Sequence, residues 1–371
     1  MEIKKKKHLL LDINKRVYNH TPGSCRFIRT STGIIANGSA GMVLIPELNI
    51  ALITSGYAKS RGVSNITGAI FLYNFTDNRN YEAKKLKIKG FNLQYFIPYG
   101  IDTYVSRGRI TVYITNSYQN TTDTVEVFQF DHNHLLLIHR KTISNDKFRN
   151  LADIAVVGAD RFITTNYAYY QKYWMQIIEF AMQSSFGSIV YYDGRQGNYL
   201  EKYFPTPNGI AINKQQNRLY VASTINEFIR IYHLRKDMSV VFATEISLLS
   251  SPNKIFIEAK SGNIWVALHP ILYKAHKHMQ DPINMDQRSP SQILRIRLQD
   301  NDKSWVITEP YANDGATIWG SSAVLFHQNS LLIGSLFGRT LHCDIETSQI
   351  QVDEKPPILA CRHKVGLVCD E

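Results

Sequence analysis

The sequence predicts an all-β protein, a six-bladed β-propeller that forms one domain. Three observations lead to this prediction. Strand-favouring residues are abundant, since the 371 residues include 21 Tyr and 17 Phe, and aromatic and β-branched side chains favour strands. Short alternating strands recur along the chain with a loose period. Two cysteines flank the repeated region, where a bond between them would close a ring.

Each copy of the repeat begins with an apolar strand, continues through a turn into a second, alternating strand, and ends with a third strand. The second and third strands are clear at 109–115 and 124–130, at 218–223 and 228–234, and at 263–268 and 292–298. The first strands begin near Val43, Ile101, Ile154, Ile210, Ile255 and Val324, so successive copies lie 58, 53, 56, 45 and 69 residues apart. A period of this size, built from short antiparallel strands, is typical of a propeller. Six copies predict six blades.

A propeller must close, because its first and last blades otherwise expose strand edges. Cys25 precedes the first copy and Cys343 ends the last. We therefore predict a disulfide between them, which would stabilise the fold by about 5 kcal/mol through loop closure. The propeller is expected over 25–345, after a basic segment 1–24 and before a tail 346–371. In the tail, Cys361 and Cys369 are expected to pair with each other.

Residues Tyr167–Phe186 interrupt the strand pattern. They are rich in aromatic residues and Met, and we interpret them as an inserted helical segment. Two interpretations remain open. The helix could be a lid or a membrane-surface helix, or it could simply pack across the top of the propeller.

The net charge and the glycosylation sequons indicate which partners and which cellular compartment to expect. The net charge is +11, but the basic residues are scattered and no recognition module accompanies them, so we expect no nucleic-acid partner. No run of 18 apolar residues exists that could span a membrane. Four cysteines and five glycosylation sequons favour the secretory pathway, the endoplasmic reticulum or the cell surface, as a membrane-associated or secreted protein. The sequons are at Asn19, Asn37, Asn65, Asn74 and Asn120. The N-terminus lacks a signal core, so either a signal or anchor lies upstream of Met1 or the protein is cytosolic. We expect the upstream segment.

Several segments, in the same order, carry a resemblance to a known family. They include Pro98-Tyr-Gly-Ile, Pro207-Asn-Gly-Ile, the run 150–158 and Gly262-Asn-Ile-Trp-Val-Ala-Leu-His-Pro. From Cys25 to about Ile345 the chain resembles the serum paraoxonase/arylesterase family. The resemblance implies a six-bladed propeller with two calcium ions in its tunnel, an N-terminal hydrophobic anchor, and hydrolysis of lactones or aryl esters. It also supports the Cys25–Cys343 bridge.

The resemblance identifies the positions that would hold these ions, and most carboxylates are missing there. At four of these positions we expect the ligand to be lost, and the residues there are Ala40, Gly41, Ala152 and Lys254. Two amides remain as possible ligands, Asn208 and Asn253. For the second ion, the carboxylate of Asp153 and the carbonyl of Ile101 remain. Calcium needs six to eight oxygen ligands, whereas the ammonium of Lys254 has no acceptor and repels a divalent cation. We therefore expect no cofactor, with calcium only if the site has been rebuilt, and we expect Lys254 to pair with Asp153.

The histidine dyad that the resemblance implies is absent. Its two positions are Tyr99 and Ser117, and neither is a general base near neutral pH. His269 matches a pocket histidine, which we interpret as structural. His276, His278 and Asp281 have the spacing of a transition-metal site, but in a polar loop we interpret that spacing as incidental.

Two functions follow from these observations. The first is a non-catalytic accessory or chaperone protein for membrane proteins such as ion-channel subunits, which the resemblance includes among its membrane-anchored members. The alternative is a calcium-dependent hydrolase of lactones and aryl esters, an arylesterase. Fold alone supports the alternative, and fold is weak evidence for chemistry.

Overall fold

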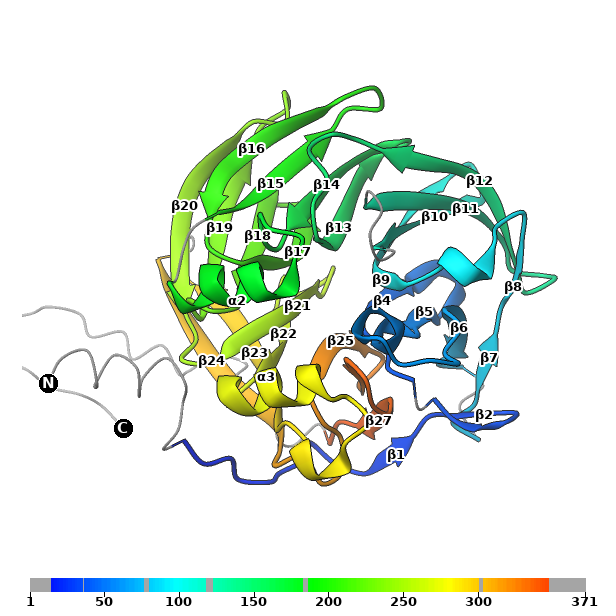
Figure 1. Ribbon diagram of the computed structural model, residues 1–371, viewed down its shortest axis with the longest axis vertical. Helices are drawn as coiled ribbons and strands as arrows, with labels where there is room; N and C mark the ends of the chain where they lie inside the picture. Colours follow the sequence, from blue (N-terminus) through cyan, green and yellow to red (C-terminus); the bar gives the residue numbers. More distant parts are fainter. Residues whose placement is uncertain are drawn as a thin grey trace, which may run out of the picture.

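Six antiparallel β-sheets surround a common axis in the computed structural model (Figure 1). The structure describes residues 15–35, 37–76, 80–117, 123–182, 186–299 and 303–346. Each sheet is one blade, and its strands follow one another in chain order from the axis outward, except that the outermost strand of the second and of the last blade comes from earlier in the chain. The prediction of a six-bladed propeller is confirmed.

The blades are numbered along the chain. Blade 1 contains β4 (Met42–Ile45), β5 (Ile50–Ser55), β6 (Ala69–Asn74) and β7 (Ala83–Lys85). Blade 2 contains β9 (Pro98–Ser106), β10 (Arg109–Asn116), β11 (Thr124–Asp131) and β12 (Leu136–Ser144), with β8 (Lys87–Lys89) parallel to β12. Blade 3 contains β13 (Leu151–Gly158), β14 (Arg161–Asn166), β15 (Gly187–Tyr192) and β16 (Gly197–Phe204).

The remaining blades follow the same plan. Blade 4 contains β17 (Pro207–Asn213), β18 (Arg218–Ser223), β19 (Phe228–Leu234) and β20 (Val240–Ser247). Blade 5 contains β21 (Ser251–Ile257), β22 (Ile264–His269), β23 (Ser291–Gln299) and β24 (Ser304–Asn313). Blade 6 contains β25 (Ser321–His327), β26 (Ser330–Ser335), β27 (Leu341–Asp344) and β1 (Cys25–Phe27). The three-strand repeat expected from the sequence was therefore incomplete, because each blade has a further, outer strand.

The core lies between neighbouring blades. Successive side chains of a strand point to opposite faces of its sheet. Apolar side chains on both faces of a blade can therefore pack against the two neighbouring blades. Leu52 and Ile70 of blade 1 pack with Val112 and Phe128 of blade 2, and all four are buried. Similar clusters join the other blades. This repeated packing explains why apolar residues recur with period two in the sequence.

Close approach of the inner strands requires glycine at particular positions. A Cβ atom added to Gly209 of β17 would lie 2.3 Å from the carbonyl oxygen of Asn253, on β21 of the next blade. A Cβ on Gly100 would lie 2.8 Å from the Cα atom of Asp153. Since real side chains do not approach so closely, these glycines allow the inner strands to converge at the axis.

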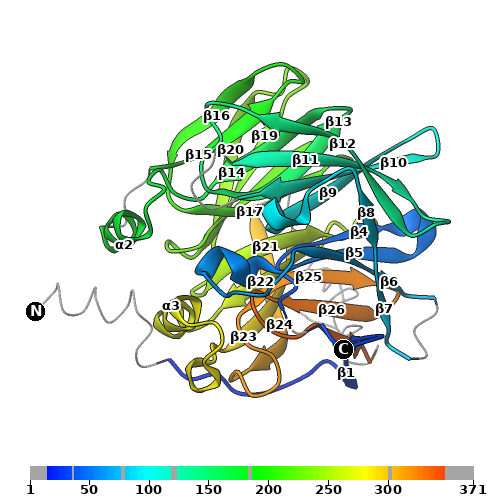
Figure 2. The same ribbon diagram turned by 45° about the vertical axis from the view of Figure 1, so that its right-hand side comes forward.

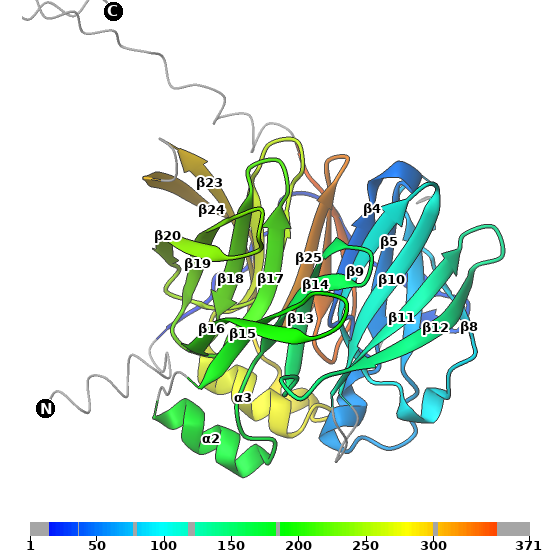
Figure 3. The same ribbon diagram turned by 90° about the horizontal axis from the view of Figure 1, so that it is seen from above.

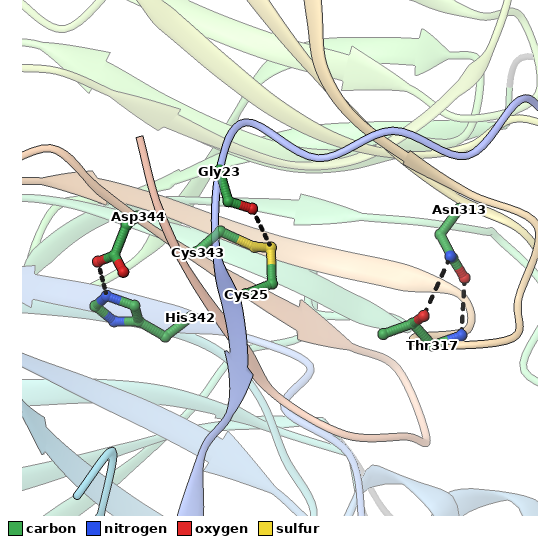
Figure 4. Close-up of a disulfide and its surroundings, with 7 residues drawn as sticks. All are labelled: Gly23, Cys25, Asn313, Thr317, His342, Cys343 and Asp344. Atoms are coloured by element: carbon green, nitrogen blue, oxygen red, sulfur yellow. Dashed lines mark hydrogen bonds and ion pairs between the residues drawn. A yellow bond between two sulfur atoms is a disulfide. The ribbon is translucent and has the colours of Figure 1, made fainter. Parts of the chain in front are cut away.

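The ring is closed by a strand from the N-terminal side. β1 pairs with β27 so that Cys25 is opposite Cys343, and their disulfide links positions 318 residues apart (Figure 4). The N-terminal strand is thereby the outermost strand of the last blade. The predicted disulfide is confirmed. A small hairpin, β2 (Arg29–Thr30) with β3 (Gly33–Ile34), leads from β1 toward blade 1.

Two α-helices lie on the same side of the propeller, as Figures 2 and 3 show. The predicted inserted helix is present but shorter than expected: α2 (Tyr173–Ala181) occupies the middle of the connection between β14 and β15. A second helix, α3 (Leu272–Gln280), connects β22 to β23. Short 3-10 helices occur at η1 (Pro46–Leu48), η2 (Tyr57–Arg61), η3 (Leu93–Tyr95) and η4 (Met285–Gln287). Among the described residues, none of the helices has the length and apolar character needed to cross a membrane.

Candidate functional site at the propeller axis

Six equivalent positions meet at the axis, each directly before the branched apolar residue of an inner strand. They are Met42, Gly100, Asp153, Gly209, Lys254 and Ala323. In blades 2 to 6 the pairing of the inner strand shifts register just before that apolar residue or one residue earlier. Such a bulge redirects side chains locally. It explains how consecutive residues of each inner strand come to line the tunnel.

A buried ion pair crosses the tunnel. The Nζ atom of Lys254 on β21 lies 3.0 Å from Oδ1 of Asp153 on β13, and both side chains are less than one-tenth exposed. Blade 4 lies between these two blades, and its equivalent residue is Gly209, which leaves room for the pair. The expectation that Lys254 pairs with Asp153 is confirmed.

The ion pair is satisfied by further contacts. Lys254 also donates to the carbonyl oxygen of Ala152 at 2.5 Å, and its Nζ atom lies 4.0 Å from the centre of the Tyr99 ring, a cation–π arrangement. The other carboxylate oxygen of Asp153 accepts from the backbone N–H of Ile210 at 3.1 Å. The pair therefore connects inner strands of blades 2, 3, 4 and 5.

Burial and pairing act in opposite directions on these two groups. Burial lowers the pKa of Lys254, and the charge of Asp153 opposes that change. Burial raises the pKa of Asp153, and Lys254 together with the N–H of Ile210 opposes it. Because each group offsets the desolvation of its partner, removal of one alone leaves an uncompensated buried charge.

A chain of side-chain hydrogen bonds lies beside the ion pair. The hydroxyl of Tyr99 donates to Oδ1 of Asn253 at 3.2 Å, and Nδ2 of Asn253 lies 3.1 Å from Nε2 of His269. Burial raises the pKa of Tyr99 far above its usual range and lowers the pKa of His269 to about 4. Tyr99 therefore keeps its proton at pH 7, and His269 is neutral but only weakly basic because its pKa lies well below pH 7.

The second remaining amide is not fully bonded. Asn208 donates from Nδ2 to the hydroxyl of Thr224 at 3.2 Å, but its buried Oδ1 atom has no hydrogen-bond partner in the part of the chain that the structure describes. Nδ1 of His269 is also without one there. Both residues contribute to the lining of one cavity.

A cavity of about 860 Å³ opens above this layer, beneath α2 and α3. Its floor includes Tyr99, Asn208, Asn253 and His269, and its walls include aromatic and apolar residues of both helices, among them Phe180 and Tyr273. A smaller cavity of about 200 Å³ lies on the other side and is lined by Gly41, Ile101, Asp153 and Lys254. The ion pair therefore separates the tunnel into two compartments.

Three of the four positions at which the sequence analysis expected lost calcium ligands lie in closely packed surroundings. Ala40 and Ala152 belong to one buried cluster with Tyr99, Leu336 and Phe337. Gly41 has no room for a carboxylate, because even a Cβ atom would lie 2.1 Å from the carbonyl oxygen of Tyr99. Ile101 is buried in its strand and pairs with Ile114.

Ser117, the second dyad position, lies in the wall of the large cavity, at the end of β10. Its neighbour in that wall is Asp123. Burial raises the pKa of the Asp123 carboxyl, and hydrogen bonds from Ser117 and from the N–H of Leu151 offset part of this rise. The structure therefore brings Tyr99, Ser117 and His269 to one cavity, and Asn253 links Tyr99 to His269 by hydrogen bonds.

The sequence analysis placed the suspected transition-metal motif in a polar loop, and that location is wrong. His276 and His278 lie on α3, and Asp281 follows its end. His276 faces the large cavity, whereas His278 is buried beneath the helix against the ring of Phe337. No cluster of three or more His, Cys, Asp or Glu side chains suited to a metal ion occurs within the described ranges.

Several residues of this region were missed by sequence reasoning. Tyr57 of η2 stacks on Tyr99 with ring centres 4.3 Å apart, and α3 covers the cavity from blade 5. The signal for α3 was present, because Leu272, Ala275 and Met279 repeat at helical spacing. The polar residues between them were taken for a loop.

The remaining predicted sites lie at the surface or outside the described residues. Asn19, Asn37 and Asn65 are exposed and Asn74 is half-buried, so glycosylation at these four stays a prediction. Asn120, Cys361 and Cys369 lie outside the described residues, as do 1–14 and the tail from 347 onward.

Comparisons with known proteins agree with this architecture. A family model described as Arylesterase matches residues 4–345. Mechanosensory abnormality protein 6 of Caenorhabditis elegans is 42% identical over 351 residues, which cover 92% of each chain. Serum paraoxonase/arylesterase 2 of Gallus gallus is 27% identical over 84% of this chain and 87% of its own. Serum paraoxonase/lactonase 3 of Homo sapiens is 26% identical over 87% and 89%, respectively.

Solved structures with little sequence similarity share the fold alone. A luciferin-regenerating enzyme superposes with a TM-score of 0.56 at 12% identity, covering 87% of this chain and 95% of its own. A structure described as a putative gluconolactonase gives a TM-score of 0.51 at 9% identity, covering 89% and 97%.

Proposed function

Because the chain belongs to the arylesterase family, we propose that it is a non-catalytic member, an accessory or chaperone protein for membrane proteins such as ion-channel subunits. The observation that carries this proposal is the buried Lys254–Asp153 pair. It occupies the axis at the layer where the family resemblance implies metal ligands.

The residues at the axis do not fit a calcium ion. An ion near Asp153 would meet the ammonium of Lys254, which already lies 3.0 Å from that carboxylate and offers no lone pair. Ala40 and Ala152 contribute only packing, and Gly41 has no room for a side chain. We propose that the ammonium supplies the positive charge that a divalent cation would otherwise bring to this layer.

The similarity among relatives supports the same proposal. The relative named for mechanosensory abnormality shares 42% of its aligned residues with this chain. The relatives named as arylesterase or lactonase that are cited above share 26–27%. Greater similarity to a protein not named for hydrolysis supports an accessory role over turnover of an ester.

The face that carries α2 and α3 supports a location at a membrane surface. Trp174 and Ile178 of α2, and Met182 directly after it, follow one another at helical spacing and are 59%, 50% and 70% exposed. The single acidic side chain of the helix, Glu179, is turned inward and accepts from the N–H groups of Tyr169 and Tyr170. An exposed apolar stripe without acidic residues is typical of a helix that lies on lipid. We propose this orientation for the helix, in preference to simple packing across the propeller.

We also propose that the chain enters the secretory pathway and is glycosylated there. The exposed sequon residues Asn19, Asn37 and Asn65, together with the Cys25–Cys343 disulfide, are what an oxidising compartment would favour.

A hydrolase remains the second candidate, and one observation favours it. The large cavity is lined by Asn208 and His269, and each of these side chains has a buried polar atom without a hydrogen-bond partner among the described residues. We place it second because Tyr99 keeps its proton at neutral pH and His269 is only a weak base.

One experiment separates the two functions. The purified chain is assayed with phenyl acetate and a δ-lactone, with calcium and with a chelator, beside a family member with proven turnover as the positive control. In parallel, ion-channel subunits are expressed in cells with and without this chain, and their surface fraction is measured by biotinylation. We expect hydrolysis at background and greater surface delivery of at least one subunit. Turnover that a chelator abolishes would contradict the proposal.

A further inference from the structure

The outer strands of three consecutive blades form a basic surface. β1, β2, β7 and β8 follow one another around the rim of the propeller, from blade 6 through blade 1 to blade 2 (Figure 1). Each of these strands carries at least one basic residue, and all of these basic side chains are exposed. We call this surface the basic band, and it consists of Arg26, Arg29, Lys84, Lys85, Lys87 and Lys89.

The fold gathers these residues from two distant parts of the sequence. The N–H of Arg29 donates to the carbonyl oxygen of Tyr81 at 2.7 Å, and Arg29 forms a parallel β-bridge with Glu82. Segment 25–30 is thereby placed beside segment 83–89. Within the second segment, the distance from the first lysine to the last is at most about 18 Å, because an extended chain spans up to about 3.6 Å per residue. The band is therefore continuous and elongated.

The pattern of residues 83–89 explains why their lysines point outward. Ala83 and Leu86 are buried in the clusters between blades, and Ile88 packs against one of these clusters. The four lysines occupy the remaining positions and are exposed. None of the six basic side chains of the band forms an ion pair with another described residue. Their charge is therefore available to a partner.

The charge of the band has one sign. β1, β2, β7, β8 and β12 contain no aspartate or glutamate. The outer strands of blades 3, 4 and 5 each contain one glutamate, at Glu201, Glu245 and Glu309. Beside the band lie Glu82, directly before β7, and Asp344 of β27, so basic groups outnumber acidic ones. Protection of a strand edge requires only a charge or two, and it does not explain why positive charge continues across three blades.

The residue types of the band indicate the kind of partner. Interfaces with folded proteins are enriched in aromatic side chains and poor in lysine. The band contains four lysines, and among the described residues none of the large exposed apolar side chains lies on β1, β2, β7 or β8. Lysine-rich surfaces of this kind bind polyanions such as heparin through charge. The band therefore suits a flexible, linear polyanion.

The position of the band separates it from the proposed membrane surface. In Figure 2, α2 and α3 lie on the left of the molecule, whereas β7 and β8 lie on the right. A planar lipid surface that contacts α2 therefore does not cover the band. A linear polymer can lie along the outer wall of the propeller without contact to either helix.

We propose that the basic band binds a sulfated glycosaminoglycan, a linear polyanion of the heparin type. The ammonium groups pair with sulfate groups, because lysine is a point charge on a flexible stem and adapts to an irregular row of anions. The proposal shares with the proposed function only the secretory compartment, where a chain meets such glycans and not nucleic acids. It does not depend on the accessory role, on the cavity or on α2.

The test compares two triple variants that have the same change in net charge. The first replaces three lysines of the band, and the control replaces three exposed lysines of blades 4 and 5. The two variants are Lys85→Gln/Lys87→Gln/Lys89→Gln and Lys236→Gln/Lys260→Gln/Lys303→Gln. The full chain is first treated with a glycosidase, so that a glycan on Asn74, at the end of β6, does not cover the band. Surface plasmon resonance then measures the affinity for immobilised heparin fragments.

We expect the band variant to bind heparin at least about tenfold more weakly than the wild type, and the control variant less than about threefold more weakly. The wild-type affinity is expected to fall steeply with added salt, and that of the band variant less steeply, because fewer counterions are released. Thermal unfolding of both variants shows whether the fold is intact. Equal weakening by the two variants would overturn the proposal, because it would mean that only the net charge matters.

Other polyanions identify the class of partner. Desulfated heparin of the same length is expected to bind much more weakly than heparin, because most of its charge has been removed. A DNA oligonucleotide and vesicles that contain anionic lipid are compared in the same buffer. If either bound as tightly as heparin and lost affinity equally in the band variant, the assignment to a sulfated glycan would be wrong. A wild-type chain that fails to bind heparin would overturn the proposal as well.

Discussion

At the scale of single residues, the axis depends on Lys254. Its ammonium contacts the carboxylate of Asp153, the carbonyl of Ala152 and the ring of Tyr99, so one side chain links blades 2 and 3 to β21 of blade 5. A buried ion pair is not in itself strong evidence of stability, because two apolar residues of similar volume can replace it without loss. The loss of one partner alone is different, since it leaves the other charge buried and unpaired.

We therefore expect Lys254→Met to destabilise the fold by about 3–5 kcal/mol. The double variant Lys254→Met/Asp153→Leu is expected to recover most of that loss, because no unpaired charge remains. Urea unfolding followed by fluorescence measures both variants. Equal stability of the single and double variants would show that the charges are not coupled.

Two buried histidines predict how stability depends on pH. Burial lowers the pKa of His278 and of His269 to about 4, from an ordinary value of 6.5. The unfolded chain therefore binds more protons than the folded chain between these values, and stability falls as the pH falls from 6.5 to 4. His278→Leu is expected to remove up to about 3 kcal/mol of this pH dependence. Unfolding curves at pH 7 and pH 4.5 measure it, and an unchanged pH dependence would contradict the assignment.

At the scale of elements, the inner strands could be predicted from the sequence and the helices only in part. All six inner strands were found, because a branched apolar residue marks each one, but in blades 2 to 6 the strand begins three or four residues before that residue. The outer strands were missed, since they are half-exposed and their apolar pattern is weak. α3 was missed because His276 and Lys277 obscured its apolar face. The ion pair was predicted because the family resemblance places both Asp153 and Lys254 at metal-ligand positions of the tunnel. The stacking of Tyr57 on Tyr99 brings a 3-10 helix against an inner strand, and no repeated pattern in the sequence connects the two.

The proposed membrane surface gives a prediction for α2. Trp174→Glu is expected to reduce binding to vesicles that contain anionic lipid, because it places a charge in the exposed apolar stripe. Tyr203→Glu is the matched control, since Tyr203 is exposed to a similar degree on β16, away from α2. Co-sedimentation measures both, and equal binding by the two variants would contradict the proposed orientation.

At the scale of the whole molecule, closure couples the ends of the propeller. β1 completes blade 6, and the disulfide between Cys25 and Cys343 encloses all six blades. Cys25→Ser/Cys343→Ser is expected to lower the free energy of unfolding by up to about 5 kcal/mol, because the open unfolded chain gains entropy. Denaturant unfolding of the variant, and of the wild type with and without reductant, measures this loss. If neither the substitutions nor the reductant changed the stability, the β1–β27 pairing would close the ring without the disulfide.

The central claim concerns what holds the axis together. If Lys254 takes the place of a divalent cation, the folded chain needs no metal at its centre. The most direct measurement is thermal unfolding of the wild type with calcium and with a chelator, combined with calcium titration calorimetry. We predict the same unfolding midpoint in both solutions and no saturable heat of binding. A midpoint that falls with the chelator, together with stoichiometric calcium binding, would contradict the account.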